Sequence, residues 1–144
     1  MGNALRNAPT TSTDGITTPE PAETLSEFLG VPLAPRDFTL KDGIRVGVDY
    51  ADTDRRTPTV LAQGYLHWGQ VKSAHRNKVI ADAFKLAWLR DTRFPEARAL
   101  LVLSTPFTRL LGSGAWLPSA LASYHIHVLI MDQNRNIQLS DTTK

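Results

Sequence analysis

Residues 44–67, IRVGVDYADTDRRTPTVLAQGYLH, decide the fold that we predict for this chain. Their first part, residues 44–51, alternates apolar with polar or small side chains, which is the period of a strand with one buried face. Residues 59–67 alternate in the same way, and a polar segment, residues 52–58, separates the two runs. The stretch therefore predicts two antiparallel strands joined as a β-hairpin.

The register of this hairpin brings polar residues together. A turn centred near Arg56 places Asp49 opposite Gln63 across the ladder. Tyr65 follows two residues later on the same face as Gln63, because successive side chains of a strand point to opposite faces. We therefore expect Asp49, Gln63 and Tyr65 to share one polar site.

The chain outside the hairpin supplies further elements. Before it we expect a short helix over residues 23–29 and a strand over residues 36–40, which a tight turn at residues 41–43 connects to the hairpin. After it, Ser73 is the expected N-cap of a helix that runs to Arg90. The remaining expected elements are a buried strand, a shorter helix and a last strand, at residues 98–104, 115–123 and 126–131.

This order, αβββαβαβ, predicts an α/β domain. An antiparallel meander followed by two right-handed crossovers gives a mixed β-sheet with helices on both faces. We assign the single domain to residues 23–132. The flanking segments, residues 1–22 and 133–144, are polar, and we expect the first to be a disordered tail and the second a C-terminal tail.

The composition is that of one small globular domain. With 144 residues, 42% of them hydrophobic, the chain can bury one core. The absence of cysteine excludes disulfides, thiolate metal ligands and cysteine nucleophiles. No run reaches the ~18 apolar residues that would span a bilayer, and the N-terminus lacks an apolar signal segment. We therefore expect a cytoplasmic protein with no membrane partner.

Positive charge gathers in the middle of the chain, although the net charge is only +2. No acidic residue occurs between Asp54 and Asp82. This window suits a phosphate-bearing partner, and its alternative is a solvated basic helix face. The residues from which we expect nucleic-acid contacts are Arg55, Arg56, Lys72, His75, Arg76 and Lys78.

Asp49, a spacing of thirteen residues and the triplet Gln63-Gly64-Tyr65 resemble the PD-(D/E)xK motif of the restriction-endonuclease-like superfamily. The motif falls on the second and third predicted strands, where that fold carries it. Residues 63–86 also resemble a group of uncharacterised small bacterial proteins of this fold. In that group a lysine after a glycine corresponds to Lys72, and the next helix carries Lys and Asp matching Lys78 and Asp82. The resemblance covers residues 40–131.

The resemblance implies a Mg²⁺-dependent nuclease. In such enzymes carboxylates hold Mg²⁺, which polarises the phosphate and lowers the pKa of its bound water. A lysine orients that water and offsets the developing charge. For this chain the resemblance implies Asp49 and Gln63 as metal ligands, with Lys72 completing the catalytic set.

Two positions depart from the family pattern. Gln63 stands where an acidic ligand is usual, and it brings no charge, so metal affinity should fall. Tyr65 stands at the usual lysine position. Lys72 replaces that lysine only if the chain folds back from the start of the helix, and Lys78 is a second candidate.

Other interpretations of these residues stay open. Gln70-Val71-Lys72 can serve as the triplet instead, which keeps the lysine but places Trp68-Gly69 inside a strand. Asp49 also fits a strand end that caps the next turn together with Asp52 and Asp54, and Gln63 also fits a buried amide that bonds to the backbone.

Two functions are therefore hypotheses. The first is a PD-(D/E)xK-type nuclease that hydrolyses phosphodiesters of nucleic acid, with DNA expected rather than RNA. The second is a catalytically degenerate scaffold of the same fold that binds nucleic acid or a protein partner, including a second copy of the chain. Gln63 and the absent strand lysine favour the second hypothesis, because both weaken the chemistry of the first.

Overall fold

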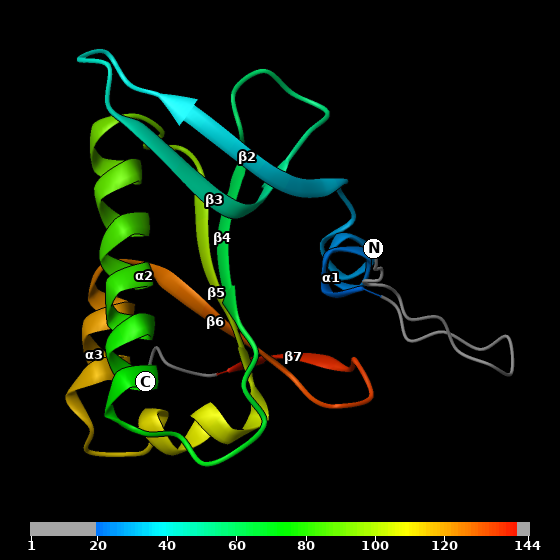
Figure 1. Ribbon diagram of the computed structural model, residues 1–144, viewed down its shortest axis with the longest axis vertical. Coiled ribbons are helices and arrows are strands. Elements are labelled where there is room, and N and C mark those ends of the chain that lie inside the picture. The colour runs from blue at the N-terminus through cyan, green and yellow to red at the C-terminus, as the bar shows by residue number, and fades with distance from the viewer. Residues whose placement is uncertain (1–19, 141–144) are drawn as a thin grey trace, which may run out of the picture.

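The computed structural model describes residues 20–140. Six strands form one mixed sheet with helices on both faces (Figure 1). The strands are β2 (Leu33–Thr39), β3 (Arg45–Asp52), β4 (Val60–Tyr65), β5 (Arg98–Ser104), β6 (Ile126–Met131) and β7 (Ile137–Ser140). The helices are α1 (Pro21–Leu29), α2 (Ser73–Thr92), the short 3-10 helix η1 (Thr105–Leu111) and α3 (Trp116–Ser123).

The predicted α/β architecture is confirmed. Strands β2, β3 and β4 form an antiparallel meander. Strands β5 and β6 then add in parallel, each after a helical crossover, and the spatial order is β2-β3-β4-β5-β6-β7. The crossover through α2 brings the start of that helix back to the carboxyl end of β4 (Figure 1).

The predicted order αβββαβαβ is wrong in two places. Helix η1 follows β5 directly, because Pro106 at its start favours a helical turn rather than an extended chain. Strand β7 pairs antiparallel with β6, from Val128↔Ser140 to Met131↔Ile137, within the segment that we predicted as a polar tail. The predicted disordered tail, residues 1–22, lies outside the described residues except for its last three, where α1 begins.

Strand β2 is longer than predicted and contains Pro35. It lies at the edge of the sheet. A proline, which has no N–H to donate, therefore does not interrupt the hydrogen bonds between two central strands. Its register with β3 shifts between Ala34 and Arg36, so Asp49 and Tyr50 together lie opposite Pro35. This is the two-against-one count of a β-bulge, a feature that re-aims side chains.

The two faces of the sheet bury separate cores. Leu61, Leu101 and Val128 pack with α2 and α3 on one face. Ala62, Val102 and Leu129 pack with Leu25 of α1 on the other. Each strand therefore contributes alternate residues to the two cores, and a polar residue in either series, such as Gln63, lies inside the protein.

Helix α2 begins with Ser73, and Lys72 rather than Ser73 is its N-cap. The helix buries Val79, Ala83, Leu86 and Leu89 against the sheet, as its apolar spacing predicts. Within residues 20–140, no helix combines the length and the apolarity that crossing a membrane requires.

Candidate functional site

A polar cluster lies where β3 and β4 diverge under α2. The pairs Tyr50↔Ala62 and Ala51↔Leu61 give the hairpin the predicted register, which places Asp49 across from Gln63. Beyond these two pairs, hydrogen bonds that involve side chains take the place of backbone hydrogen bonds between β3 and β4. The Asp49 N–H donates to Gln63 Oε1 at 2.8 Å, and the Gly64 N–H donates to Asp49 Oδ2 at 3.0 Å.

Helix α2 completes the cluster with an ion pair. Gln63 is 2% exposed, and its Nε2 donates to Oδ1 of Asp82, which is 4% exposed, at 3.1 Å. Lys78 Nζ donates to both Asp82 oxygens, at 2.7 and 2.8 Å. Lys78 and Asp82 are four residues apart and therefore lie on one face of the helix. The buried carboxylate of Asp82 is thus neutralised within its own helix.

Lys78, not Lys72, is the lysine that reaches this cluster. Its Nζ lies 5.7 Å from the centre of the Tyr65 ring, and its side chain is 48% exposed. The two turns of α2 from Lys78 to Lys85 face the diverging strands, because Lys85 Nζ also donates to the Gly47 carbonyl at 3.0 Å. One stripe on α2 consists of Lys78, Asp82 and Lys85. This stripe contacts the sheet and is not only a solvent-exposed helix face.

Lys72 lies at the exposed start of α2. Its backbone N–H donates to Nδ1 of His75 at 2.9 Å. Strand β4 ends at Tyr65, so Gln70, Val71 and Lys72 belong to the connection that leads into α2. The alternative triplet Gln70-Val71-Lys72 therefore does not occupy a strand, which is the position that the family motif requires.

The cluster does not fit a divalent metal ion in this arrangement. The Gln63 oxygen accepts a backbone N–H, and both Asp82 oxygens accept from Lys78. Asp49 is the one acid of the cluster with an oxygen that makes no hydrogen bond among residues 20–140. Across the same residues no three His, Cys, Asp or Glu side chains gather as metal ligands would.

Two histidines join the start of α2 to the end of β4. The rings of His67 and His75 stack with centroids 3.8 Å apart, and His67 Nε2 lies 2.9 Å from the Gln70 carbonyl oxygen. Desolvation, with smaller contributions from His67 and Lys72, lowers the pKa of His75 below its usual 6.5. The lowered pKa favours the neutral form of His75, which agrees with its Nδ1 accepting the Lys72 N–H.

The predicted basic window divides into two surfaces. Arg55 and Arg56 precede β4, whereas Lys72 and Arg76 follow it, so they lie at opposite ends of that strand. The guanidinium of Arg36 donates to the carbonyls of Asp52, Arg55 and Arg56, and thereby shapes the loop at the first end. Asp52, rather than Asp49, caps this loop by accepting the N–H groups of Thr59 and Val60.

A surface hollow of about 530 Å³ lies at the carboxyl edge of β5 and β6. Its wall includes Trp68, Arg109, Gln133 and Asn134, and within residues 20–140 the Arg109 and Gln133 side chains make no hydrogen bond. Our sequence interpretation missed these residues. The available signal was topological, because ligands of open α/β sheets bind outside the carboxyl ends of parallel strands.

Comparison of this chain with models of protein families, with curated proteins and with solved structures finds no significant match.

Proposed function

We propose that this chain is a nucleic-acid-binding protein with a restriction-endonuclease-like scaffold, and that it binds DNA without cutting it. The observation that carries the proposal is the carboxyl edge of β4, β5 and β6, where Trp68 and Arg109 line one hollow and the chain that follows β4 carries Lys72 and Arg76 at the start of α2. Three of these four side chains are cationic, and all three are exposed. Exposed cationic side chains suit a phosphate backbone.

Trp68 favours single strands over duplexes. It is partly buried and lines the hollow together with Arg109. An indole in such a position offers a face to an unpaired base, and stacking of this kind contributes about 1–3 kcal/mol per base. Gln133 and Asn134, on the same wall, present amides that can bond to base edges.

The buried cluster supports binding over cleavage. The Gln63 amide donates a hydrogen bond to the Asp82 carboxylate, and Lys78 pairs with the same carboxylate. These groups therefore stabilise the fold. Cleavage by the mechanism of that superfamily needs carboxylates that are free to hold a metal ion, and within the cluster, as the structure describes it, only Asp49 retains a free oxygen.

The test is fluorescence anisotropy with single- and double-stranded DNA and RNA, over a series of salt concentrations. We expect single-stranded DNA to bind most tightly. Lys72→Ala/Arg76→Ala should weaken binding on every sequence and reduce the slope of log K against log[salt] by about 1.4, which corresponds to two lost phosphate contacts on a single strand. Trp68→Ala should weaken single-strand binding about 10-fold and leave the salt slope unchanged.

The matched control is Arg55→Ala/Arg56→Ala, which removes the same charge from the opposite end of β4. Its affinity should stay within about twofold of the parent protein. Equal losses in the two double variants would show that net charge alone drives binding and would contradict the proposed surface.

A second candidate function is metal-dependent phosphodiester hydrolysis at the cluster. The supporting observation is that Asp49 keeps one oxygen without a hydrogen bond among the described residues, beside the linked side chains of Gln63, Asp82 and Lys78. Incubation of DNA and RNA with Mg²⁺ or Mn²⁺ tests it. Cutting that disappears in Asp49→Ala and Lys78→Ala, but persists in the helix-stripe control Lys85→Ala, would replace the binding proposal by this one.

A further inference from the structure

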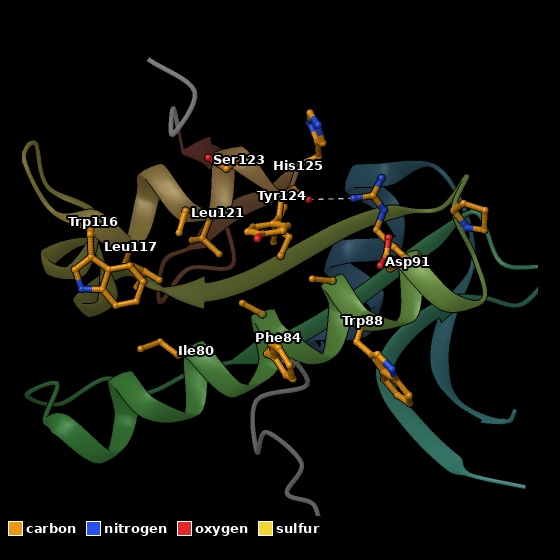
Figure 2. A pocket seen from close by; sticks show the side chains of 16 residues that line it. Ile80, Phe84, Trp88, Asp91, Trp116, Leu117, Leu121, Ser123, Tyr124 and His125 are labelled. Carbon is orange, nitrogen blue, oxygen red and sulfur yellow. Dashed lines mark hydrogen bonds between the residues drawn. The ribbon is translucent and has the colours of Figure 1, made fainter. Parts of the chain in front are cut away.

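An apolar groove runs between α2 and α3 (Figure 2), and its lining includes no residue of the polar cluster or of the basic edge. Its volume is about 610 Å³, and sixteen residues line it. Arg90 and Asp91 are the only Lys, Arg, Asp or Glu side chains among them, and Asp91 lies at the end opposite Trp116 (Figure 2). The Arg90 guanidinium already donates to the carbonyls of Ala97 and Tyr124. The groove therefore offers an almost uncharged surface.

Exposed aromatic side chains are concentrated on this groove. Phe84 is 77% exposed, Tyr124 64% and Trp116 59%, and all three line it. The other large apolar residues with high exposure in residues 20–140 are single residues in other parts of the fold, namely Phe28, Ile44 and Leu139. Isolated apolar residues are ordinary on a protein surface, whereas a contiguous patch of this kind marks an interface.

The terminal segments of this chain are poor candidates to fill the groove. Residues 1–19 contain only three large apolar side chains, Met1, Leu5 and Ile16, and residues 141–144 contain none. A groove lined by aromatic and aliphatic residues needs an occupant with an apolar face of similar extent.

We propose that the groove is the interface between two copies of this chain, related by a two-fold axis. An isologous interface requires one surface to carry both a projection and the matching cavity. Phe84 projects from α2 at the rim of the groove (Figure 2), so Phe84 of each copy can enter the groove of the other. The charges of Arg90 and Asp91 cancel, so two such faces meet without the like-charge repulsion that the basic edge would create.

The three exposed aromatic side chains supply about half of the area that a standard interface buries on one partner. Covered aromatic side chains bury about 150–250 Å² each, so the exposed parts of Phe84, Tyr124 and Trp116 offer roughly 400 Å². A standard interface buries about 800 Å² on each partner. The rest of the area would come from the half-buried and exposed residues of the wall and rim, such as Ile80, Trp88 and Pro95.

Sedimentation equilibrium of the full chain over the micromolar range tests the proposal. We expect a dimer whose dissociation constant rises at least about 30-fold in Phe84→Glu, as for loss of an interface hot spot. Phe28→Glu is the matched control, because it changes an exposed phenylalanine on α1 and should leave the dimer intact. A parent protein that stays monomeric at all concentrations, or a Phe84→Glu variant that stays dimeric, overturns the proposal.

A second measurement locates the interface even where Phe84→Glu folds poorly. The chain has no cysteine, so Ala87→Cys introduces a single thiol in the wall of the groove. Its reaction with a maleimide should slow about 10-fold or more as the protein concentration rises through the dimer dissociation constant. A reaction rate that does not depend on concentration in a dimeric sample would place the interface elsewhere, for example at the edge strands, and would overturn the proposal.

Discussion

Gln63 carries two opposite hydrogen-bonding roles that a carboxylate cannot reproduce. Its oxygen accepts from Asp49 N–H, and its nitrogen donates to Asp82. Glutamate is the residue typical of the PD-(D/E)xK motif at this position. In Gln63→Glu, the new carboxylate would lie about as close to the Asp82 carboxylate as the amide nitrogen does now, inside the protein. We expect this variant to lose about 3 kcal/mol of its free energy of unfolding at pH 7, measured by urea denaturation.

The double variant Gln63→Glu/Asp82→Asn provides the control for this prediction. An asparagine at position 82 can donate to the new carboxylate, so part of the lost stability should return despite the broken pair with Lys78. If Gln63→Glu were as stable as the parent protein, the amide would not be necessary for this packing, and the cluster would have room for an acidic ligand.

Asp52 makes stability depend on pH. Burial acts to raise the pKa of its carboxyl, but the hydrogen bonds from Thr59 and Val60 prevail and hold it below its usual 3.8. The folded state then binds the proton less readily than the unfolded state, so this stabilisation is complete above about pH 5 and is lost as the pH falls through the folded-state pKa. We expect Asp52→Asn to cost about 2 kcal/mol at pH 7. Urea titrations should show the difference from the parent protein shrinking below about pH 4, whereas a constant difference would exclude titration of Asp52 as its origin.

At the scale of elements, strand β7 is the clearest departure from what the sequence indicated. It has four residues, and only Ile137 packs against the core on the α1 side. So short and polar a segment carries too little apolar periodicity to be distinguished from a tail. It nevertheless pairs along β6 and covers an edge that would otherwise be open.

Truncation distinguishes a C-terminal strand that stabilises the sheet from a polar tail that adds nothing to stability. A chain that ends at Asp132 should lose its β7 pairing, lower its midpoint of thermal unfolding by several degrees and aggregate through the β6 edge. A chain that ends at Ser140 keeps β7 and should match the parent protein. Scanning calorimetry and light scattering measure both effects, and equal behaviour of the two truncations would mean that β7 adds nothing to stability.

The hairpin was predictable because its two-residue period and short polar connection fix the register. Asp49 and Gln63 therefore met as expected. The bulge at Asp49–Tyr50 was not predictable. It lies opposite Pro35, and the sequence pattern predicted a first strand that begins only at Arg36. The hollow at Trp68 and Arg109 was missed for a related reason. Forty-one positions separate these residues, and the parallel pairing of β4 with β5 brings them together.

At the scale of the whole molecule, the two proposed surfaces belong to different parts of the fold. The nucleic-acid surface lies at the carboxyl edge of the parallel strands, and the dimer groove lies between α2 and α3. No residue lines both the groove and the hollow. A dimer formed through the groove therefore keeps two nucleic-acid surfaces accessible, and one ligand with two binding segments can engage both.

This separation predicts avidity. Two single strands of about 12 nucleotides each, joined by a flexible spacer, should bind the dimer about 100-fold more tightly than one such strand, because the second contact becomes intramolecular. Phe84→Glu should retain only about a twofold advantage, which is the statistical value for two independent segments. Anisotropy titrations with a series of spacer lengths would measure the effect, with Phe28→Glu as the dimeric control. The advantage should peak at one spacer length, because the distance between the two surfaces is fixed. An advantage that survives in Phe84→Glu would mean that a single subunit binds both segments, and that the groove has no part in nucleic-acid binding.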